Sequence, residues 1–434
     1  MTIATKPKPP AVAKGGGAVP PAAGRGADDP VLVAEGRARI EWADGQMPVL
    51  RSIRERLAAE RPLAGLRIGA CLHVTAETAC LMQALAAGGA EVALCAANPL
   101  TTQDEVAAAL RDDGCATHGR RGEDADAYVE GIVAVVDRRP QVTLDDGADL
   151  LTFIHAGRSE LLPGLVGGTE ETTTGLVRLR ALELACPVIA VNEARTERLF
   201  NDHYGTGQST LDGILRATNL LLAGKTIVVL GYGWTGKGVA LRARGAGAQV
   251  IVCEIDPMRA LEARMEGFEV MPAIVAAERG DVFVTVTGSR DVLGAEHFAV
   301  MKDGAVLANA GHFDVEIDLA ALHAAADGGP REVLPLVTQF DLGGRRLNLL
   351  ASGRVVNLAA GQGHPAAVMD MSFANQALAV EHLVRHGAEL GPGVHPVPEA
   401  VDREVARLKL ASLGVEIDSS SAEQEQYMRG WGAG

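Results

Sequence analysis

The sequence predicts an α/β protein built from two parallel-sheet units. Short apolar runs typical of strands alternate with longer amphipathic stretches along most of the 434 residues. One of these runs leads into a glycine-rich turn at Gly231, Gly233 and Gly236. Strands and helices in alternation favour parallel pairing through right-handed crossovers. A chain of this length can bury more than one core, so we expect two domains.

The composition excludes several classes of function. The formal net charge of −15 argues against a nucleic-acid surface, which requires a basic footprint. No apolar run is long enough to span a bilayer, so no membrane partner is expected. The six cysteines show no CxxC pair and no metal-ligand spacing, which indicates buried thiols in a reducing cytoplasm and no metal site. Residues 1–29 are rich in Pro, Ala and Gly, lack an apolar signal region, and are predicted to form a disordered tail.

The first predicted domain spans residues 30–207 and is completed by residues 365–399. Its expected strands are 66–72, 91–97, 142–150 and 187–193, and its expected helices are 49–60, 77–89 and 103–114. Polar residues stand at the ends of three of these strands, namely His73, Asp145, Asp146, Asn192 and Glu193. Ligands of parallel sheets bind beyond the carboxyl ends of the strands. These positions therefore predict a binding or catalytic site at one edge of the first sheet.

The second predicted domain spans residues 208–364. A helix at 209–224 leads to a strand at 226–230 and the glycine turn, and further strands are expected at 249–255, 281–288, 305–311 and 354–361. A long helix at 366–386 is expected to return the chain to the first domain. Residues 400–434 form a helix-rich C-terminal tail in this interpretation.

The glycine turn has the pattern G-x-G-x-x-G between an apolar strand and a helix. Gly231 permits a tight turn, Gly233 allows a pyrophosphate to approach the backbone, and Gly236 allows the helix and the strand to pack closely. The helix N-terminus offers free N–H groups to the phosphates. Glu254 stands near the end of the next strand, where a carboxylate would bind ribose hydroxyls and repel a 2′-phosphate. The sequence therefore predicts a Rossmann-type domain that binds NAD.

Six longer motifs carry a resemblance to a known family. They are CLHVTAET at 71–78, LDDGADL at 144–150, GGTEETTTG at 167–175, GYGWTGKG at 231–238, NAGHFDVEID at 309–318 and GHP at 363–365. In this order they resemble S-adenosylhomocysteine hydrolase, over roughly residues 32–413. The resemblance implies an adenine nucleoside substrate, NAD as cofactor, two domains that close as a clamshell, and a homo-oligomer, either a tetramer or a dimer.

The resemblance also implies roles for individual residues. The implied catalytic residues are His73, Asp146, Glu171, Glu197, Asn201 and His312. The implied substrate-binding residues are Thr75, Glu77, Asn192 and His364, of which Thr75, Glu77 and His364 surround the adenine. The implied NAD-binding residues are Thr172, Thr173, Thr174, Gly231, Gly233, Gly236, Glu254, Thr287 and Asn357. A lone threonine or histidine is more often a helix cap or a core residue, but the joint match favours a site.

The chain departs from the family where the catalytic base is expected. Glu197 stands in place of a catalytic Lys, and Asn201 stands in place of the Asp four residues later. Residues four apart share one face of a helix, so the Asn201 amide can hydrogen-bond Glu197 without the repulsion of a second carboxylate. The two changes compensate each other and favour a repurposed site. A buried Glu197 with a raised pKa would then be the general base.

Other departures lie around the expected cofactor. Asp202, Thr206 and Arg259 replace an Asn, a Cys and an Asn of the family. The C-terminal residues 425–434 do not match the family segment whose Lys and Tyr reach a neighbouring subunit's NAD.

The favoured interpretation is a lyase that uses the first half of the family reaction. It would oxidise C3′ transiently, remove the C4′ proton and expel the 5′ group by β-elimination. With hydroxide as the leaving group the enzyme is a nucleoside dehydratase, converting a psicofuranine-like nucleoside to a decoyinine-like one in antibiotic biosynthesis. The alternatives are hydrolysis of S-adenosylhomocysteine to adenosine and homocysteine, a catalytically silent homologue that binds NAD or a nucleoside, and a nucleoside oxidase or epimerase.

Overall fold

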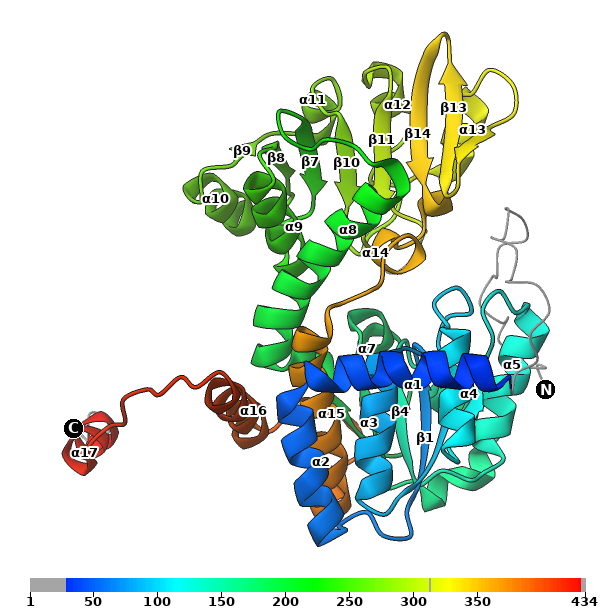
Figure 1. The fold of residues 1–434 in the computed structure, drawn as a ribbon. Helices are drawn as coiled ribbons and strands as arrows, with labels where there is room; N and C mark the ends of the chain where they lie inside the picture. Colours follow the sequence, from blue (N-terminus) through cyan, green and yellow to red (C-terminus); the bar gives the residue numbers. More distant parts are fainter. Residues whose placement is uncertain (1–28, 312–313, 431–434) are drawn as a thin grey trace, which may run out of the picture.

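Two separate sheets organise the chain, one in each of two α/β domains (Figure 1). The computed structural model describes residues 29–311 and 314–430. The predicted α/β class is confirmed in both domains. The predicted tail at 1–29, apart from Asp29, and the predicted site residue His312 lie outside the described residues.

The first sheet has seven parallel strands in the order β15-β6-β5-β4-β1-β2-β3. They are β1 (Arg67–Leu72), β2 (Glu91–Ala96), β3 (Ala116–His118), β4 (Val142–Asp145), β5 (Gly167–Glu170), β6 (Pro187–Ala190) and β15 (Gly393–Pro396). Every residue of β4, β5 and β6 is buried, as expected where helices cover both faces of a parallel sheet.

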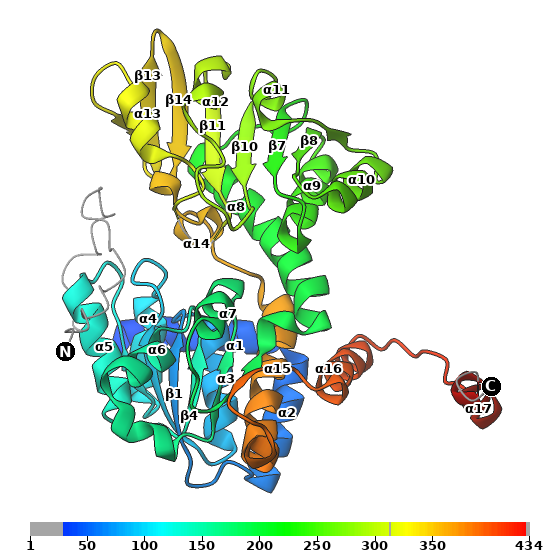
Figure 2. The same cartoon turned by 180° about the vertical axis from the view of Figure 1, so that it is seen from behind.

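The helices of the first domain form two layers. They are α1 (Pro30–Gly45), α2 (Pro48–Glu60), α3 (Ala76–Ala87), α4 (Asp104–Asp112), α5 (Ala125–Val136), α6 (Asp149–Gly157), α7 (Thr173–Arg180), α15 (Ala366–His386) and α16 (Glu399–Ser412), with short turns η1 (Ser159–Gly164), η2 (Val191–Glu193) and η5 (Gly387–Glu389). One apolar core packs the helices α1, α2, α3, α4 and α15 against the face of the sheet seen in Figure 1. Another joins α5 and α6 to the opposite face, which Figure 2 shows from behind.

The second sheet has eight strands in the order β12-β13-β14-β11-β10-β7-β8-β9. They are β7 (Thr226–Leu230), β8 (Gln249–Cys253), β9 (Glu269–Val270), β10 (Val282–Thr285), β11 (Ala305–Asn309), β12 (Arg331–Leu334), β13 (Val337–Leu342) and β14 (Arg345–Leu350). The helices around it are α8 (Gly207–Thr218), α9 (Trp234–Gly245), α10 (Pro257–Met265), α11 (Ala273–Ala277), α12 (Ala295–Val300), α13 (Leu319–Ala325) and α14 (Val356–Ala359), with the turn η4 (Ala351–Gly353). β7 has β8 on one side and β10 on the other, so the strand order reverses at β7, which is where parallel sheets bind ligands.

Three sequence predictions of strands are corrected. The predicted strand at 142–150 ends at Asp145, and residues 149–150 already belong to α6. The run at 354–361, predicted to be a strand, forms the short helix α14. Its β-branched valines suggest a strand. The segment is helical instead because Val356 packs, fully buried, in the core that β7 and β11 share. The predicted strand at 187–193 ends at Ala190, and Asn192 lies in the following turn η2. The antiparallel strands β12, β13 and β14 were not predicted.

A π-helix connects the two domains. This element, η3 (Glu197–Thr206), follows η2 of the first domain and continues directly into α8 of the second. Residues 360–365 bring the chain back from α14 to α15, as Figure 1 shows. The two connections lie side by side, since Thr206 Oγ1 at the end of η3 lies 3.0 Å from His364 Nε2.

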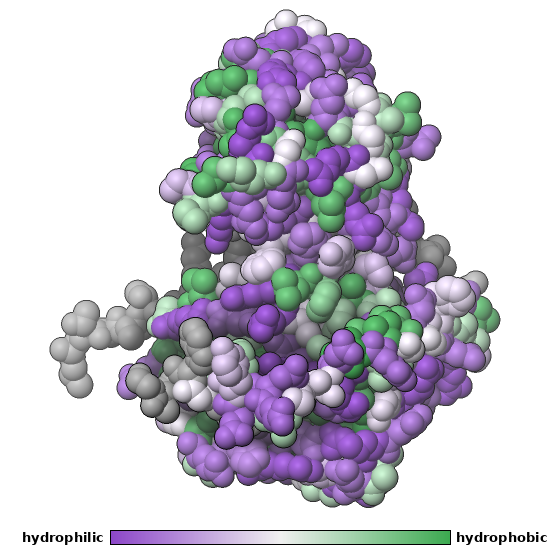
Figure 3. Space-filling model, turned by 90° about the vertical axis from the view of Figure 1, so that its left-hand side faces the viewer, coloured by the Kyte–Doolittle hydropathy of each residue, from purple (hydrophilic) through white to green (hydrophobic). Residues whose placement is uncertain are grey.

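The C-terminal helices differ in their packing. α16 packs against α15 and α2, whereas α17 (Ala422–Gly430) projects away from the body of the molecule in Figures 1 and 2. No helix within the described residues is long and apolar enough to cross a membrane. Polar side chains cover much of both domains on the face drawn in Figure 3.

Candidate active site

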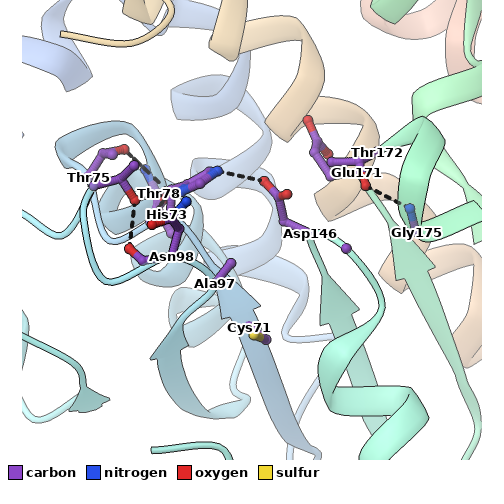
Figure 4. Close-up of polar contacts among 12 residues, drawn as sticks. Cys71, His73, Thr75, Thr78, Ala97, Asn98, Asp146, Glu171, Thr172 and Gly175 are labelled. Atoms are coloured by element: carbon purple, nitrogen blue, oxygen red, sulfur yellow. Dashed lines mark hydrogen bonds and ion pairs between the residues drawn. The ribbon is translucent and has the colours of Figure 1, made fainter. Parts of the chain in front are cut away.

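Four sequence-predicted site residues meet at the carboxyl edge of the first sheet. His73 follows β1, Asp146 follows β4, Glu171 follows β5 and Asn192 follows β6. Since β6, β5, β4 and β1 are consecutive neighbours in the sheet, these side chains are brought to one place. Figure 4 shows the imidazole of His73 and the carboxyl of Asp146 directed toward each other, with Glu171 on the neighbouring strand end.

The hydrogen bonds around His73 fix the proton on one ring nitrogen. His73 Nδ1 lies 2.6 Å from Thr101 Oγ1, and that hydroxyl donates its proton to the carbonyl of Asn98 at 2.9 Å. Nδ1 must therefore be the donor to Thr101. His73 Nε2 lies 3.4 Å from Asp146 Oδ2, while the buried Asp146 Oδ1 has no hydrogen-bond partner. The pair can hold a proton at Nε2 or on Asp146 and deliver it to a bound molecule.

Two other acidic residues at the strand ends do not join this cluster. Asp145 accepts hydrogen bonds from the backbone N–H groups of Leu150 and Leu151 at the start of α6. Its burial raises its pKa to about 7. Glu193 forms ion pairs with Arg180 and Arg198. We assign a structural role to both acids.

Glu197 begins η3 and is buried, with only 3% of its surface exposed. Burial, together with the negative charges of Glu171 and Asp202, raises the pKa of Glu197 well above its ordinary value. The neighbouring polar side chains of Ser372 and Asn201 act in the opposite direction and lower the pKa of Glu197. Glu197 Oε2 and Asn201 Oδ1 are both buried without a hydrogen-bond partner, so each can accept a hydrogen bond from a bound substrate.

Glu171 is held by two residues of α15 that the sequence analysis did not identify. Ser372 Oγ donates a hydrogen bond to Glu171 Oε1, and Gln376 Nε2 donates one to Oε2 at 2.6 Å. Burial raises the pKa of Glu171 to about 7 despite these donors. Both α15 residues are fully buried. Polar residues on a helix whose apolar residues predict a buried face are the signal that could have revealed them.

Two of the three expected adenine-binding residues lie at a cleft of about 780 Å³ between the domains, and Thr75 is not among the residues that line it. Glu77 and His364 both line it. Burial lowers the pKa of His364 to about 4, so its ring is neutral, and its Nε2 lies 3.0 Å from Thr206 Oγ1. Thr75 is the N-cap of α3, because its side chain accepts a hydrogen bond from Thr78 N. Burial also raises the pKa of Glu77.

The glycine turn has the geometry that a dinucleotide requires. Gly231 has φ +105° in the left-handed region, and a Cβ added to Gly236 would lie 2.0 Å from the Gly231 carbonyl oxygen. A Cβ on Gly233 would meet only the Arg259 guanidinium, at 3.9 Å, so the backbone there is open to a phosphate. Glu254 follows β8 and accepts hydrogen bonds from Tyr232, Ile255 and Asp256 N–H groups, which fixes its carboxylate beside the turn.

The remaining cofactor candidates are divided between the two domains. Thr172 is the N-cap of α7, and Thr173 Oγ1 donates to Asn192 Oδ1 at 2.8 Å. The nearby Thr174 is half-buried. Thr287 follows β10 and donates through both its N–H and its hydroxyl to Glu316 Oε2. Asn357 of α14 is buried with an unpaired Oδ1, an acceptor that suits an amide N–H group of a bound cofactor.

The sequence models of two domains match this chain. The S-adenosyl-L-homocysteine hydrolase model matches residues 28–161, and the model of that family's NAD-binding domain matches residues 202–363. The adenosylhomocysteinase of Aquifex aeolicus is 56% identical over 409 residues, which cover 93% of this chain and 98% of that protein.

The chain belongs to the S-adenosyl-L-homocysteine hydrolase family. Another relative in this family is the S-inosyl-L-homocysteine hydrolase of Methanocaldococcus jannaschii, 52% identical over 407 residues, with 93% of this chain and 98% of that protein covered. The adenosylhomocysteinase of Gloeobacter violaceus is 54% identical, with 93% and 95% covered. The crystal structure of a dipicolinate synthase polypeptide from Bacillus halodurans has a TM-score of 0.50 and 14% identity, covers 74% of this chain and 99% of that one, and supports the fold alone.

Membership of the S-adenosyl-L-homocysteine hydrolase family confirms NAD as the cofactor and implies a substrate derived from a nucleoside. The described residues fit NAD, because the glycine turn, the Glu254 carboxylate and the unpaired Asn357 acceptor lie in the matched domain. No group of His, Cys, Asp and Glu that could hold a metal ion occurs in the part of the chain that the structure describes.

Proposed function

We propose that the protein oxidises the 3′-hydroxyl of an adenine nucleoside and then eliminates its 5′ substituent. The observation that carries this proposal is the buried Glu197 carboxyl with its unpaired Oε2, which stands among the strand-end residues and on the element that leads to the NAD-binding domain. NAD, when bound, supplies the acceptor for a hydride from C3′. Oxidation also requires a base for the hydroxyl proton, and Glu197 is the side chain proposed to accept it.

The elimination step needs a second proton carrier near C5′. Once C3′ is a ketone, the C4′ proton is acidic. The His73–Asp146 pair would accept this proton, and the electron pair left at C4′ would form the C4′–C5′ double bond as the 5′ group departs. His73 and Asp146 are proposed to protonate that group, since their contact can hold a proton at Nε2 or on the carboxyl. Return of the hydride to C3′ and of the proton from Glu197 to the oxygen then restores the alcohol.

We propose hydroxide as the leaving group, which makes the protein a nucleoside dehydratase of natural-product biosynthesis. Hydroxide departs only when it is protonated, and this site is rich in carboxyls of raised pKa. Burial raises the pKa of Glu171 and of Asp202 to about 7 and that of Glu197 well above its ordinary value. The unpaired acceptors on Asn201 and Asp146 suit a sugar with an additional hydroxyl, such as a ketose nucleoside.

The second candidate is hydrolysis of S-adenosylhomocysteine to adenosine and homocysteine. The names of the relatives support this candidate more directly than the dehydratase. A thiolate is a good leaving group and requires no acid from the protein, so the His73–Asp146 contact would then serve to position the substrate or to activate water.

Mass spectrometry of NAD-loaded protein in heavy water distinguishes these candidates. Adenosine, S-adenosylhomocysteine and a ketose adenine nucleoside are incubated separately, with the Glu197→Gln variant as the matched control. Loss of one water from the ketose nucleoside, absent in the variant, supports the dehydratase. Release of homocysteine establishes the hydrolase instead. If no substrate changes and no deuterium enters C4′, the proposed chemistry is wrong and a silent NAD- or nucleoside-binding homologue takes its place.

A further inference from the structure

The turn after β4, which carries Asp146, has an uncommon backbone conformation. Gly147 and Ala148 follow Asp146 with φ angles of +104° and +64°, both in the left-handed region. Glycine adopts this region without strain, whereas an alanine there is strained, and Ala148 is fully buried. A strained backbone persists only where the surrounding structure holds it in place. The turn therefore requires contacts that fix it.

Gly147 is held on both of its backbone polar groups. Its N–H donates a hydrogen bond to Glu170 Oε1 at 2.9 Å, and its carbonyl accepts one from Arg178 Nη1. The same guanidinium nitrogen donates to Asp149 Oδ1 at 2.7 Å, at the start of α6. Two side chains from the end of β5 and from α7 thus fix the residue that follows Asp146. We call Glu170 and Arg178 the Gly147 clamp.

Glu170 is built into this position by its surroundings. Its exposed fraction is 0%, and its Oε1 also accepts hydrogen bonds from the N–H and the hydroxyl of Thr172, at 2.9 and 2.8 Å. The Thr172 hydroxyl in turn accepts one from the N–H of Gly175 (Figure 4). A Cβ on Gly175 would lie 2.1 Å from Glu170 Cδ, so the carboxyl fits only because residue 175 is a glycine. Three donors therefore converge on one buried oxygen.

The other contacts of Asp146 leave the direction of its side chain open. Its N–H donates to the carbonyl of Cys71 at 2.9 Å, which fixes the backbone before the side chain. The backbone after it depends on Gly147, which as a glycine adopts either sign of φ. Asp146 Oδ1 is buried without a hydrogen-bond partner, so no hydrogen bond to that oxygen holds the carboxyl.

We propose that the Gly147 clamp consists of positioning residues for Asp146. By holding Gly147 on both sides, the clamp keeps the strained turn in place, and the turn keeps Asp146 Oδ2 3.4 Å from His73 Nε2. The inference rests on the proposed role of His73 and Asp146 as carriers of the C4′ proton. Loss of either side of the clamp lets the turn relax out of the left-handed region, and the Asp146 carboxyl then turns away from the imidazole.

Nitrogen NMR of the NAD-loaded protein with isotope-labelled histidine tests the clamp independently of turnover. The ring resonances of His73 are assigned by their loss in His73→Gln. Asp146→Ala gives the position of the Nε2 resonance when the carboxyl is absent. Glu170→Met keeps the length of the side chain but removes the acceptor, and Arg178→Met removes the donor. Both are expected to move the His73 Nε2 resonance toward its position in Asp146→Ala.

Two control variants accompany this measurement. Glu170→Gln retains the oxygen that accepts all three hydrogen bonds, and it should keep the wild-type resonance. Glu381→Met removes the ion pairs with Arg56 and Arg385 between α2 and α15, so it lowers stability without touching the turn, and it should also keep the resonance. A wild-type resonance in Arg178→Met would overturn the inference even if Glu170→Met did not fold, because the Arg178 side chain is 35% exposed. An equal shift in Glu381→Met would overturn it as well.

Rapid mixing separates the two steps that the clamp should affect differently, using whichever nucleoside reduces NAD in the wild type. Arg178→Met is expected to slow removal of the C4′ proton roughly 10²-fold, the lower end of what a positioned acid or base contributes. NADH formation, which is assigned to Glu197 as the base, should slow much less. Arg178→Lys should restore part of the proton removal, because an ammonium can donate to the Gly147 carbonyl.

Equal slowing of the two steps in Arg178→Met would contradict a positioning role for Asp146, since a general loss of structure would slow both. If no nucleoside reduces NAD in the wild type, the proposed function fails. The His73 resonance still decides in that case whether the Gly147 clamp holds Asp146 against the imidazole.

Discussion

Thr196 and Asp402 are joined by two hydrogen bonds although 206 positions separate them. Asp402 Oδ1 accepts from both the N–H and the hydroxyl of Thr196, at 3.0 and 2.5 Å, and Oδ2 accepts from the N–H of Arg195 at 2.7 Å. Thr196 immediately precedes Glu197. A carboxylate on the C-terminal helix α16 therefore fixes the point at which the chain enters η3.

Replacement of Asp402 by Ala is expected to destabilise the protein and to misplace Glu197. Two backbone N–H groups and one hydroxyl lose their acceptor. The N–H and the hydroxyl of Thr196 are buried, and each such loss costs about 1–3 kcal/mol. Denaturant unfolding measures the stability, and NADH formation measures the placement of the base. Glu404→Ala on the same helix is the control, because Glu404 forms an ion pair with Arg407 one turn along α16 and does not contact Thr196. Equal stability of the two variants would contradict the anchoring role.

Glu197→Gln is expected to slow the reduction of bound NAD by roughly 10²–10⁴-fold, since an amide of the same shape cannot accept the hydroxyl proton. The affinity for NAD should remain, because Glu197 begins η3 and does not belong to the glycine turn. Calorimetric titration of NAD and rapid-mixing kinetics measure the two effects separately. Full turnover in this variant would remove Glu197 as the base.

Asn201→Asp is expected to lower activity and to move its pH optimum upward. It would place another carboxyl beside Glu197, and the added negative charge would raise the pKa of Glu197 further. Asn201→Ala is the comparison, since it removes the amide without adding charge. A pH–rate profile for each variant gives the result, and identical optima would show that residue 201 does not act on Glu197 electrostatically.

Folding stability is expected to fall as the pH rises from about 4.5 to about 7. Burial raises the pKa of Glu171 to about 7, so the folded protein keeps a proton that the unfolded chain loses. The unfolded state binds fewer protons in this window, and stability declines by up to about 1.4 kcal/mol per pH unit for this group. Glu171→Gln should flatten the curve in part, since Asp145 titrates with the same sign. Urea unfolding across this range measures it, and parallel curves would contradict the assignment.

Glu254→Ala is expected to weaken NAD binding by about 1.5–3 kcal/mol, as hydrogen bonds from ribose hydroxyls to a charged group are lost. Selectivity against NADP should also decline, because the repulsion of a 2′-phosphate disappears. Calorimetric titration with both dinucleotides measures these changes. Glu269→Ala is the control, since Glu269 forms an exposed ion pair with Arg279 away from the turn. Unchanged NAD affinity would contradict the proposed role of Glu254.

The rule for strand ends predicted where the candidate site lies but could not separate neighbouring acids. Asp145 and Asp146 have the same chemistry, yet Asp145 caps α6 and Asp146 faces His73. Consecutive side chains at a strand end point in opposite directions, and only the position of the next helix determines which one is free. The glycine turn was more informative, because its geometry depends on local backbone requirements.

The contribution of α15 could not be predicted because it is a long-range contact. Ser372 and Gln376 lie about 200 positions from Glu171, and no local pattern connects them. The short helix α14 was missed for a related reason. Its valines favour a strand, but burial against the second core determines its structure.

The element η3 bears the proposed base and is also one of the two tethers between the domains. A rotation of one domain against the other must therefore twist the segment on which Glu197 and Asn201 stand. The distance from the carboxyl to a bound sugar is then a function of the interdomain angle. Such a rotation would couple oxidation of the substrate to the angle between the domains, and a ligand that held the domains at another angle would inhibit without binding where the sugar binds.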